Sequence, residues 1–186
     1  MATRIQPLIT IAELDACPDD GNRYELIEGE LFVSRAARLP HQLVLHNLQM
    51  VIGSYLKQNP IGRVVPGSGA VFSDYDAVIP DLVFVRNENW DRIVADERFV
   101  KAPDLVIEIL SPGKVNRERD TLVKRQLYSR YGVEEYWIVD PENREVEIYS
   151  QLEQSLAKVS TFRDHQTLRS SMLPGLELDV QAIFDR

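Results

Sequence analysis

Two acidic side chains lie in strongly apolar segments, and their type and surroundings suit chemistry at a metal ion. Asp81 lies in Ile79-Pro-Asp-Leu-Val-Phe-Val, and Glu108 lies in Leu105-Val-Ile-Glu-Ile-Leu. A buried carboxylate without a partner is costly, so each must meet a cation, a donor or water. If the two segments are neighbouring strands, about 4.8 Å apart, both carboxylates can bind one divalent ion. Oxygen ligands favour Mg²⁺ or Mn²⁺ over zinc.

A structural interpretation of the same two acids stays open at this stage. Each carboxylate could lie at a strand end, where it caps a backbone group or pairs with an arginine. Asp104 is a third acid in the second segment, but it lies four residues before Glu108. That spacing separates the two by about 13 Å along a strand, so they cannot bind the same ion. We expect Asp104, after Pro103, to mark the start of the strand.

Hydrophobic periodicity predicts the elements that position these acids. Continuous apolar runs over 78–85 and 104–110 are typical of strands covered on both faces. Apolar residues recur every three or four positions over 41–59, which predicts an amphipathic helix. The remaining predicted elements are a helical turn over 9–15 capped by Thr10, a hairpin over 24–33 that turns at Glu28-Gly29, a helix over 116–131, strands over 135–139, 144–150 (at a sheet edge) and 157–162, and a last helix capped by Asp179.

This order of elements predicts an α/β (α+β) fold, in which helices flank a mixed central sheet. Within the strand over 135–139, we expect Trp137 in the core and Tyr136 at the surface. The helix over 116–131 is predicted to bury four apolar side chains: Leu122, Val123, Leu127 and Tyr131.

Length and composition fit a globular protein with its own core. The chain has 186 residues, of which 44% are hydrophobic and 27% charged, so we expect a single domain over 1–186 with an N-terminal extension over 1–20. Cys17 is the sole cysteine, which excludes an intramolecular disulfide and a cysteine-rich metal site. The sequence has neither a signal-peptide stretch nor a membrane span, which predicts a cytoplasmic location.

The net charge of −8 counts against a nucleic-acid partner, because backbone contacts usually need a basic patch. A local basic cluster could still exist near the predicted helix over 116–131, where Glu118 and Asp120 would dilute it. Its candidate members are Arg117, Arg119, Lys124, Arg125 and Arg130.

Several motifs in combination resemble a known family. Pro80-Asp81, 26 intervening residues and Glu108 are similar to the P-D…(D/E)-x-K signature of restriction-endonuclease-like nucleases. Five longer segments resemble the Uma-type endonuclease family within the PD-(D/E)XK superfamily, and the similarity spans 22–184. They are Tyr24-Glu-Leu-Ile-Glu-Gly-Glu, Pro80-Asp-Leu-Val-Phe-Val, Ala102-Pro-Asp-Leu-Val-Ile-Glu-Ile-Leu-Ser-Pro, Gly132-Val-Glu-Glu-Tyr-Trp-Ile-Val-Asp-Pro141 (with Tyr128 before it) and Leu173-Pro-Gly-Leu-Glu-Leu178.

The resemblance implies a restriction-endonuclease-like core that hydrolyses phosphodiester bonds in DNA with Mg²⁺ or Mn²⁺. It implies that Asp81, Glu108 and the carbonyl of Ile109 bind the metal, which would polarise the phosphate and help to ionise the attacking water. It also implies a homodimer, because cleavage of a duplex needs two active centres.

The chain departs from the signature at one position. The lysine of the signature belongs two residues after the glutamate, where this chain has Leu110. Asp120, Lys124 and Tyr128 follow at a spacing of four, which places them on one helical face. We predict that Lys124 replaces the missing lysine, orienting the water or stabilising the developing charge. The alternative is a surface pair of Asp120 and Lys124, worth roughly a few tenths of a kcal/mol.

Auxiliary residues are less constrained by the sequence. An acid from an early element often joins such sites, and Glu25 or Glu30 could serve, although both could be exposed strand charges. His41, at the start of the helix over 41–59, could contact the site but is expected in solvent. His46 lies five residues later and faces another way. Tyr128 is a further auxiliary candidate because it shares the face of Lys124.

Two other functions stay open beside the nuclease. A nuclease-fold protein with little or no catalytic activity could serve as a DNA-binding or protein-interaction module, as Leu110 and the acidic charge suggest. A small-molecule hydrolase that uses the same metal-binding acids is the third class. The sequence contains no glycine-rich phosphate loop, no Gly-x-Ser-x-Gly elbow and no zinc-finger spacing.

Overall fold

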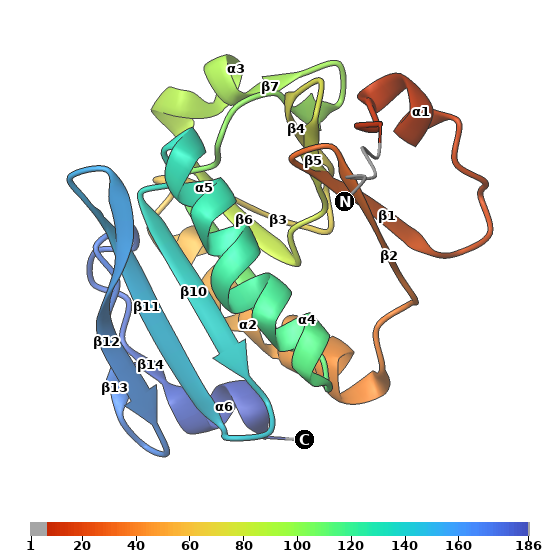
Figure 1. Cartoon of the computed structure of the whole chain (residues 1–186). Coiled ribbons are helices and arrows are strands. Elements are labelled where there is room, and N and C mark those ends of the chain that lie inside the picture. Colours follow the sequence, from red (N-terminus) through yellow and green to blue (C-terminus); the bar gives the residue numbers. More distant parts are fainter. Residues whose placement is uncertain (1–6, 186) are drawn as a thin grey trace.

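Two six-stranded sheets frame the structure, a computed structural model that describes residues 7–185 (Figure 1). Residues 1–6, which belong to the predicted extension over 1–20, lie outside the described residues. The sheet that carries the candidate site has the strand order β12-β11-β10-β9-β6-β3. Its strands are β3 (Gly62–Pro66), β6 (Leu82–Arg86), β9 (Leu105–Ile109), β10 (Glu135–Asp140), β11 (Glu145–Leu152) and β12 (Ser155–Arg163).

This central sheet is mixed, as predicted. β9 and β10 are parallel and are joined by a helical crossover, whereas the other neighbouring strands are antiparallel. The second sheet has the order β2-β1-β5-β4-β8-β7, and β13 pairs with β14 separately. Those strands are β1 (Arg23–Ile27), β2 (Glu30–Ser34), β4 (Ala70–Ser73), β5 (Asp76–Val78), β7 (Val94–Ala95), β8 (Arg98–Phe99), β13 (Thr167–Leu168) and β14 (Leu178–Asp179).

Helices cover both faces of the central sheet (Figure 1). The long helix α2 (Leu39–Gln58) and α6 (Val180–Phe184) pack on one face, and the crossover helix passes over the other. That crossover helix consists of α4 (Lys114–Glu118), a π-helical turn (Arg119–Lys124) and α5 (Arg125–Tyr131). The smaller helices are α1 (Ile11–Asp15) and α3 (Trp90–Ile93), the latter preceded by a 3₁₀ turn (Asn87–Asn89). No helix within residues 7–185 is long and apolar enough to cross a membrane.

The alternation of β9 divides its side chains between these two layers. Leu105, Ile107 and Ile109 belong to the apolar cluster that contains α2 and α6. Val106 and Leu110 belong to the cluster beneath the crossover helix. Because side chains alternate along a strand, Glu108 lies on the crossover-helix face, between these two apolar residues.

Most predicted elements are confirmed by the structure. Thr10 precedes α1, and the hairpin of β1 and β2 turns at Glu28 and Gly29, whose φ angles are 52° and 76°. Asp179 caps α6, since its side chain accepts a hydrogen bond from the N–H of Gln181 at 3.0 Å. The predicted strand over 104–110 corresponds to β9.

The predicted strand over 78–85 was wrong as a single element. β5 ends at Val78 in one sheet and β6 begins at Leu82 in the other. Pro80 lies between them, and a proline cannot donate a hydrogen bond to a strand ladder. Asp81 therefore lies in the connection immediately before β6, not inside a strand.

The predicted edge position of the strand over 144–150 was also wrong. β11 pairs with β10 on one side and with β12 on the other, so the strand predicted over 157–162 forms the edge instead. Tyr136, expected at the surface, is fully buried beside Trp137, because β10 is an interior strand whose two faces are both covered.

The buried face of the crossover helix differs from the prediction. Leu127 is buried as expected and Val123 is half-buried, but Leu122 is 49% exposed. Asp120 and Lys124 are buried instead. Helical spacing explains the difference, because Asp120, Lys124 and Leu127 share one face of the helix at intervals of four and three residues, whereas Leu122 projects from another side.

Candidate active site

Asp81 and Glu108 come together where β6 meets β9. The two strands are antiparallel, with Leu82 opposite Ile107, so one step further along the same register places Asp81 opposite Glu108. Directly opposed residues project their side chains to the same face of a sheet. The N–H of Ile109 donates to Oδ2 of Asp81 at 2.9 Å, which ties the connection before β6 to the end of β9. The prediction that the two segments are neighbours is confirmed.

Asp81 is buried and surrounded by donors. Besides the N–H of Ile109, its Oδ2 lies 3.0 Å from Nε2 of His41, and Nη1 of Arg23 donates to its Oδ1 at 3.1 Å. Burial alone would raise the pKa of Asp81, but the hydrogen bond with His41 and its charge outweigh it and lower the pKa to about 2. Asp81 is therefore an anion throughout the neutral range.

Glu108 is equally buried but its acidity is shifted the other way. Its Oε1 accepts hydrogen bonds from Nζ of Lys124 at 3.0 Å and from the hydroxyl of Tyr128 at 2.6 Å. Burial raises the pKa of Glu108 to about 8, against the opposing charge of Lys124. Its other oxygen, Oε2, forms no hydrogen bond with the described residues, so one side of the carboxyl group is open for a ligand.

Lys124 lies at the centre of a group of carboxylates. Its Nζ is 2.8 Å from Oε1 of Glu25, 3.0 Å from Glu108 and 4.0 Å from Oδ1 of Asp120. Burial would lower the pKa of Lys124, but the charges of Glu108 and Glu25 raise it above its ordinary value, so the side chain stays an ammonium ion. The alternative of an exposed Asp120–Lys124 pair was wrong, because both side chains are buried.

Of the two early acids, the structure places Glu25 at the site. It is buried on β1, and its Oε1 also accepts the N–H of Ile79 at 2.9 Å. Burial would raise the pKa of Glu25, but the neighbouring ammonium of Lys124 lowers it. Glu30 is exposed at the start of β2 and does not line the pocket.

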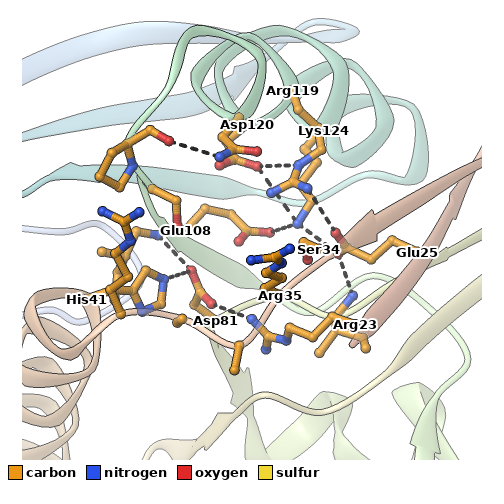
Figure 2. A pocket seen from close by; sticks show the side chains of 18 of the residues that line it. Arg23, Glu25, Ser34, Arg35, His41, Asp81, Glu108, Arg119, Asp120 and Lys124 are labelled. Atoms are coloured by element: carbon orange, nitrogen blue, oxygen red, sulfur yellow. Dashed lines mark hydrogen bonds and ion pairs between the residues drawn. The ribbon is translucent and has the colours of Figure 1, made fainter. Parts of the chain in front are cut away.

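These side chains line a pocket of about 320 Å³ between the second sheet, the start of α2 and the crossover helix (Figure 2). His41 is only 6% exposed, so the expectation of a solvated histidine was wrong. The reason is that the first turn of α2 lies against the connection before β6, where His41 reaches Asp81. Leu110 is buried in the apolar cluster beneath the crossover helix and does not line the pocket.

Three arginines of the pocket were not predicted from the sequence. Arg23, Arg35 and Arg38 line it together with Arg119. The alternation of β1 could have indicated Arg23, because it lies two residues before Glu25 and so on the same face. Arg35 and Arg38 lie in the connection between β2 and α2, and no periodic pattern singles out residues of such a segment.

The predicted basic cluster does not form one patch. Arg117 donates to Asp140 at 2.7 Å, and Arg130 of α5 pairs with Glu28 in the turn of the β1–β2 hairpin. The guanidinium of Arg125 lies 5.1 Å from the ring centre of Tyr149. Arg119 and Lys124 instead point into the pocket, where Nε of Arg119 donates to Oδ1 of Asp120 at 3.1 Å.

Asp104 has the structural role that was expected. It lies immediately before β9 at the end opposite the pocket. Its Oδ2 accepts the N–H of Arg86 at 2.8 Å, and its Oδ1 accepts Nε of the same arginine at 2.9 Å. Asp104 therefore anchors β9 to β6 and cannot contribute to a site at Glu108.

The chain matches a known protein family over most of its length. The family model of Uma2, described as "Putative restriction endonuclease", matches residues 11–181. The chain belongs to the Uma2 family. The resemblance found in the motifs is thereby confirmed. Comparison with curated proteins found no match.

A solved structure supports the fold of this Uma2 protein. It is described as "a putative nuclease belonging to DUF820 from Anabaena variabilis ATCC 29413", and it superposes with a TM-score of 0.74 at 22% sequence identity. The match covers 95% of this chain and 97% of the other. The description of the family supports a nuclease function for the chain, and the solved structure shows the fold that the two proteins share.

Proposed function

We propose that this chain is a metal-dependent endonuclease that hydrolyses phosphodiester bonds in DNA, with Mg²⁺ or Mn²⁺ held by Asp81, Glu108 and the carbonyl of Ile109. One observation carries the proposal: the register of β6 and β9 sets the two acids opposite each other at the wall of a polar pocket. The functional form we expect is a homodimer, since both strands of a duplex must be cut.

The donor set suits a hard divalent cation. Asp81 is anionic, and Oε2 of Glu108 faces no hydrogen-bond donor among the described residues. The N–H of Ile109 points to Asp81, and in an extended strand the C=O of the same residue points to the same side. Mg²⁺ commonly takes one or two carboxylates and completes its shell with water and substrate phosphate. When bound, such an ion would polarise the phosphate and lower the pKa of water.

The site has too few protein ligands to complete the coordination shell of a metal ion. Within residues 7–185, no group of three or more His, Cys, Asp or Glu side chains is arranged to hold a metal ion. A site with two carboxylates and a carbonyl therefore depends on water and on substrate oxygens for the rest of its ligands. This agrees with Mg²⁺ or Mn²⁺ and argues against a structural zinc site.

Lys124 supplies the positive charge that the lysine of the nuclease signature would provide at the position of Leu110. Its ammonium group lies beside Glu108 and is held there by Glu25, so it can donate hydrogen bonds to the attacking water or to the charge that develops on the phosphate. Tyr128 holds the Glu108 carboxyl group through its hydroxyl. On the other acid, His41 restricts the orientation of Asp81. These three contacts preorganise the groups that would meet the substrate.

A binding module without turnover is the second candidate function. It is favoured by the internal pairing of the site, because each of Asp81, Glu25 and Glu108 already has a cationic partner. This candidate predicts DNA binding without cleavage.

The test is a plasmid-nicking assay with Mg²⁺, Mn²⁺ or EDTA. We expect metal-dependent nicking that falls at least about 100-fold in Asp81→Asn and in Glu108→Gln, the scale seen when a group that stabilises the transition state is removed. Asp104→Asn is the matched control, because it removes a buried acid at the other end of β9 and should keep the wild-type rate. Nicking that persists in both site variants would refute the proposal, and DNA binding without any nicking would favour the module.

A further inference from the structure

The connection between β2 and α2 carries two arginines that have no ion-pair partner among the described residues. Arg35 and Arg38 are exposed, line the pocket and form no ion pair with any described residue. We call the segment 34–38 the arginine arm. Figure 2 shows Ser34 and Arg35 of this arm beside Asp81 and Glu25.

The other lysine and arginine side chains of the pocket already form ion pairs with acidic side chains. Arg23 binds Asp81, and Arg119 binds Asp120. Lys124 lies between Glu25 and Glu108, as described above. A phosphate that enters the pocket must therefore compete for these three cations, whereas the two guanidinium groups of the arm are free to bind it.

The arm also adds positive charge to the pocket. Arg35 and Arg38 supply two of the five lysine and arginine side chains that line the pocket, against four acidic side chains. Because the other three cations form ion pairs with acids inside the pocket, the arm supplies the positive charge that is unpaired among the described residues. This local charge counters the repulsion that the net charge of −8 on the whole chain exerts on a polyanion. The arm thus favours the approach of nucleic acid to the pocket.

The N-terminal end of α2 adds to the positive charge that Arg35 and Arg38 supply. The 20-residue helix begins directly after Arg38, has no side-chain cap and carries no acid in its first turn. The N-terminus of a helix exposes unpaired N–H groups and a partial positive charge. Arginine adds a planar fork that matches two phosphate oxygens at once.

We propose that Arg35 and Arg38 bind the phosphodiester backbone of DNA next to the bond that the Asp81 and Glu108 site would cleave. The proposal rests on the proposed function for the position of that bond. Its test measures binding and does not depend on turnover.

The experiment measures the affinity of a fluorescein-labelled 20-base-pair duplex, and of one of its single strands, by anisotropy in EDTA over a range of NaCl concentrations. The proteins are the wild type, Arg35→Gln, Arg38→Gln and the double variant. Arg98→Gln is the matched control, because Arg98 is exposed, forms no ion pair with the described residues and lies outside this pocket. Thermal unfolding verifies that each variant folds.

We expect the double variant to bind at least tenfold more weakly than the wild type, and each single variant to show part of that loss. The magnitude of the negative slope of log K against log[salt] should decrease by about 2 on the duplex and by about 1.5 on the single strand. The reason is that each phosphate contact contributes about 0.9 to this slope on duplex DNA and about 0.7 on single-stranded DNA. A comparison of the two labelled DNAs shows which form the arm prefers. The Arg98→Gln control should stay within twofold of the wild type.

Three results would overturn the proposal for the arginine arm. They are wild-type affinity for DNA in the double variant, an equal loss of affinity in Arg98→Gln, and no DNA binding by the wild type. The two proposals fail separately. If the double variant binds DNA more weakly and no protein nicks the plasmid, the proposal for the arginine arm stands and the nuclease proposal is refuted. If nicking depends on Asp81 and the double variant binds DNA as the wild type does, the nuclease proposal stands and the proposal for the arginine arm is refuted.

Discussion

Nζ of Lys124 lies 3.0 Å from Oε1 of Glu108, although the two residues are 16 positions apart in the chain. Glu108 lies on β9, and Lys124 ends the π-helical turn of the crossover helix that follows. The contact places a cation beside the acid without a lysine two residues further along the strand. Leu110 can therefore remain part of the apolar cluster while the site keeps its ammonium group.

Replacing Lys124 should destabilise the fold. Lys124→Met leaves the buried Glu25 without its partner at 2.8 Å, and an uncompensated buried charge costs about 3–5 kcal/mol. Urea unfolding measures the loss, and adding Glu25→Gln should restore part of it. The control is Lys158→Met, which breaks an exposed pair with Glu147 and should cost less than about 1 kcal/mol. Similar losses in both single variants would contradict the buried network.

Removing the hydroxyl of Tyr128 should loosen Glu108. Tyr128→Phe deletes a hydrogen bond of 2.6 Å to a fully buried carboxyl group, so we expect a loss of about 1–3 kcal/mol in the free energy of unfolding. We also expect slower nicking, because the orientation of Glu108 is less restricted. Tyr149→Phe removes a comparable bond to Glu147, outside the pocket, and should leave nicking unchanged. Equal nicking by the two variants would argue against the positioning role.

The raised pKa of Glu108 predicts a pH-dependent cost in stability. Its pKa is about 8 in the folded chain against an ordinary value of 4.5. Between these values the folded chain holds a proton that the unfolded chain has released, so stability from this group falls as the pH rises from 4.5 to 8. Glu108→Gln cannot ionise and still accepts hydrogen bonds from Lys124 and Tyr128.

We therefore expect Glu108→Gln to be more stable than the wild type at pH 8, by at least about 1 kcal/mol or about 2–4 °C in melting temperature. The advantage should vanish near pH 4.5. Thermal unfolding at both pH values measures it in metal-free buffer. Glu177→Gln is the control, because that acid is exposed in a surface pair with Arg169. A pH-independent difference between Glu108→Gln and the wild type would count against the raised pKa.

His41 should keep the pKa of Asp81 low. Its Nε2 lies 3.0 Å from Oδ2 of Asp81, so His41→Ala should raise the pKa of Asp81 above about 2. A depressed pKa stabilises the fold above the ordinary value of 3.8, and that stability is lost as the pH falls toward 2. The acid-unfolding midpoint of His41→Ala should therefore move to higher pH. His46→Ala, on the exposed side of α2, should unfold like the wild type.

Local patterns were sufficient for much of the fold and for the two acids. Apolar, β-branched runs indicated β9 and β10, and the Glu-Gly pair indicated the hairpin turn, because these features depend on neighbouring residues alone. Asp81 and Glu108 were recognisable because a carboxylate in an apolar segment is costly wherever that segment lies. The spacing of Asp120, Lys124 and Tyr128 likewise indicated one helical face.

The amino-acid order alone thus determined most of the longer strands, the main helices and the identity of the central carboxylates. The tertiary structure decided which distant groups meet them: Arg23 and Glu25 from β1, His41 from the first turn of α2, and the arginine arm. It also decided that Tyr136 is buried and that Leu122 is exposed. These outcomes depend on strand register and on how one layer covers another. Both are set by contacts between segments far apart in the chain, which no local pattern records.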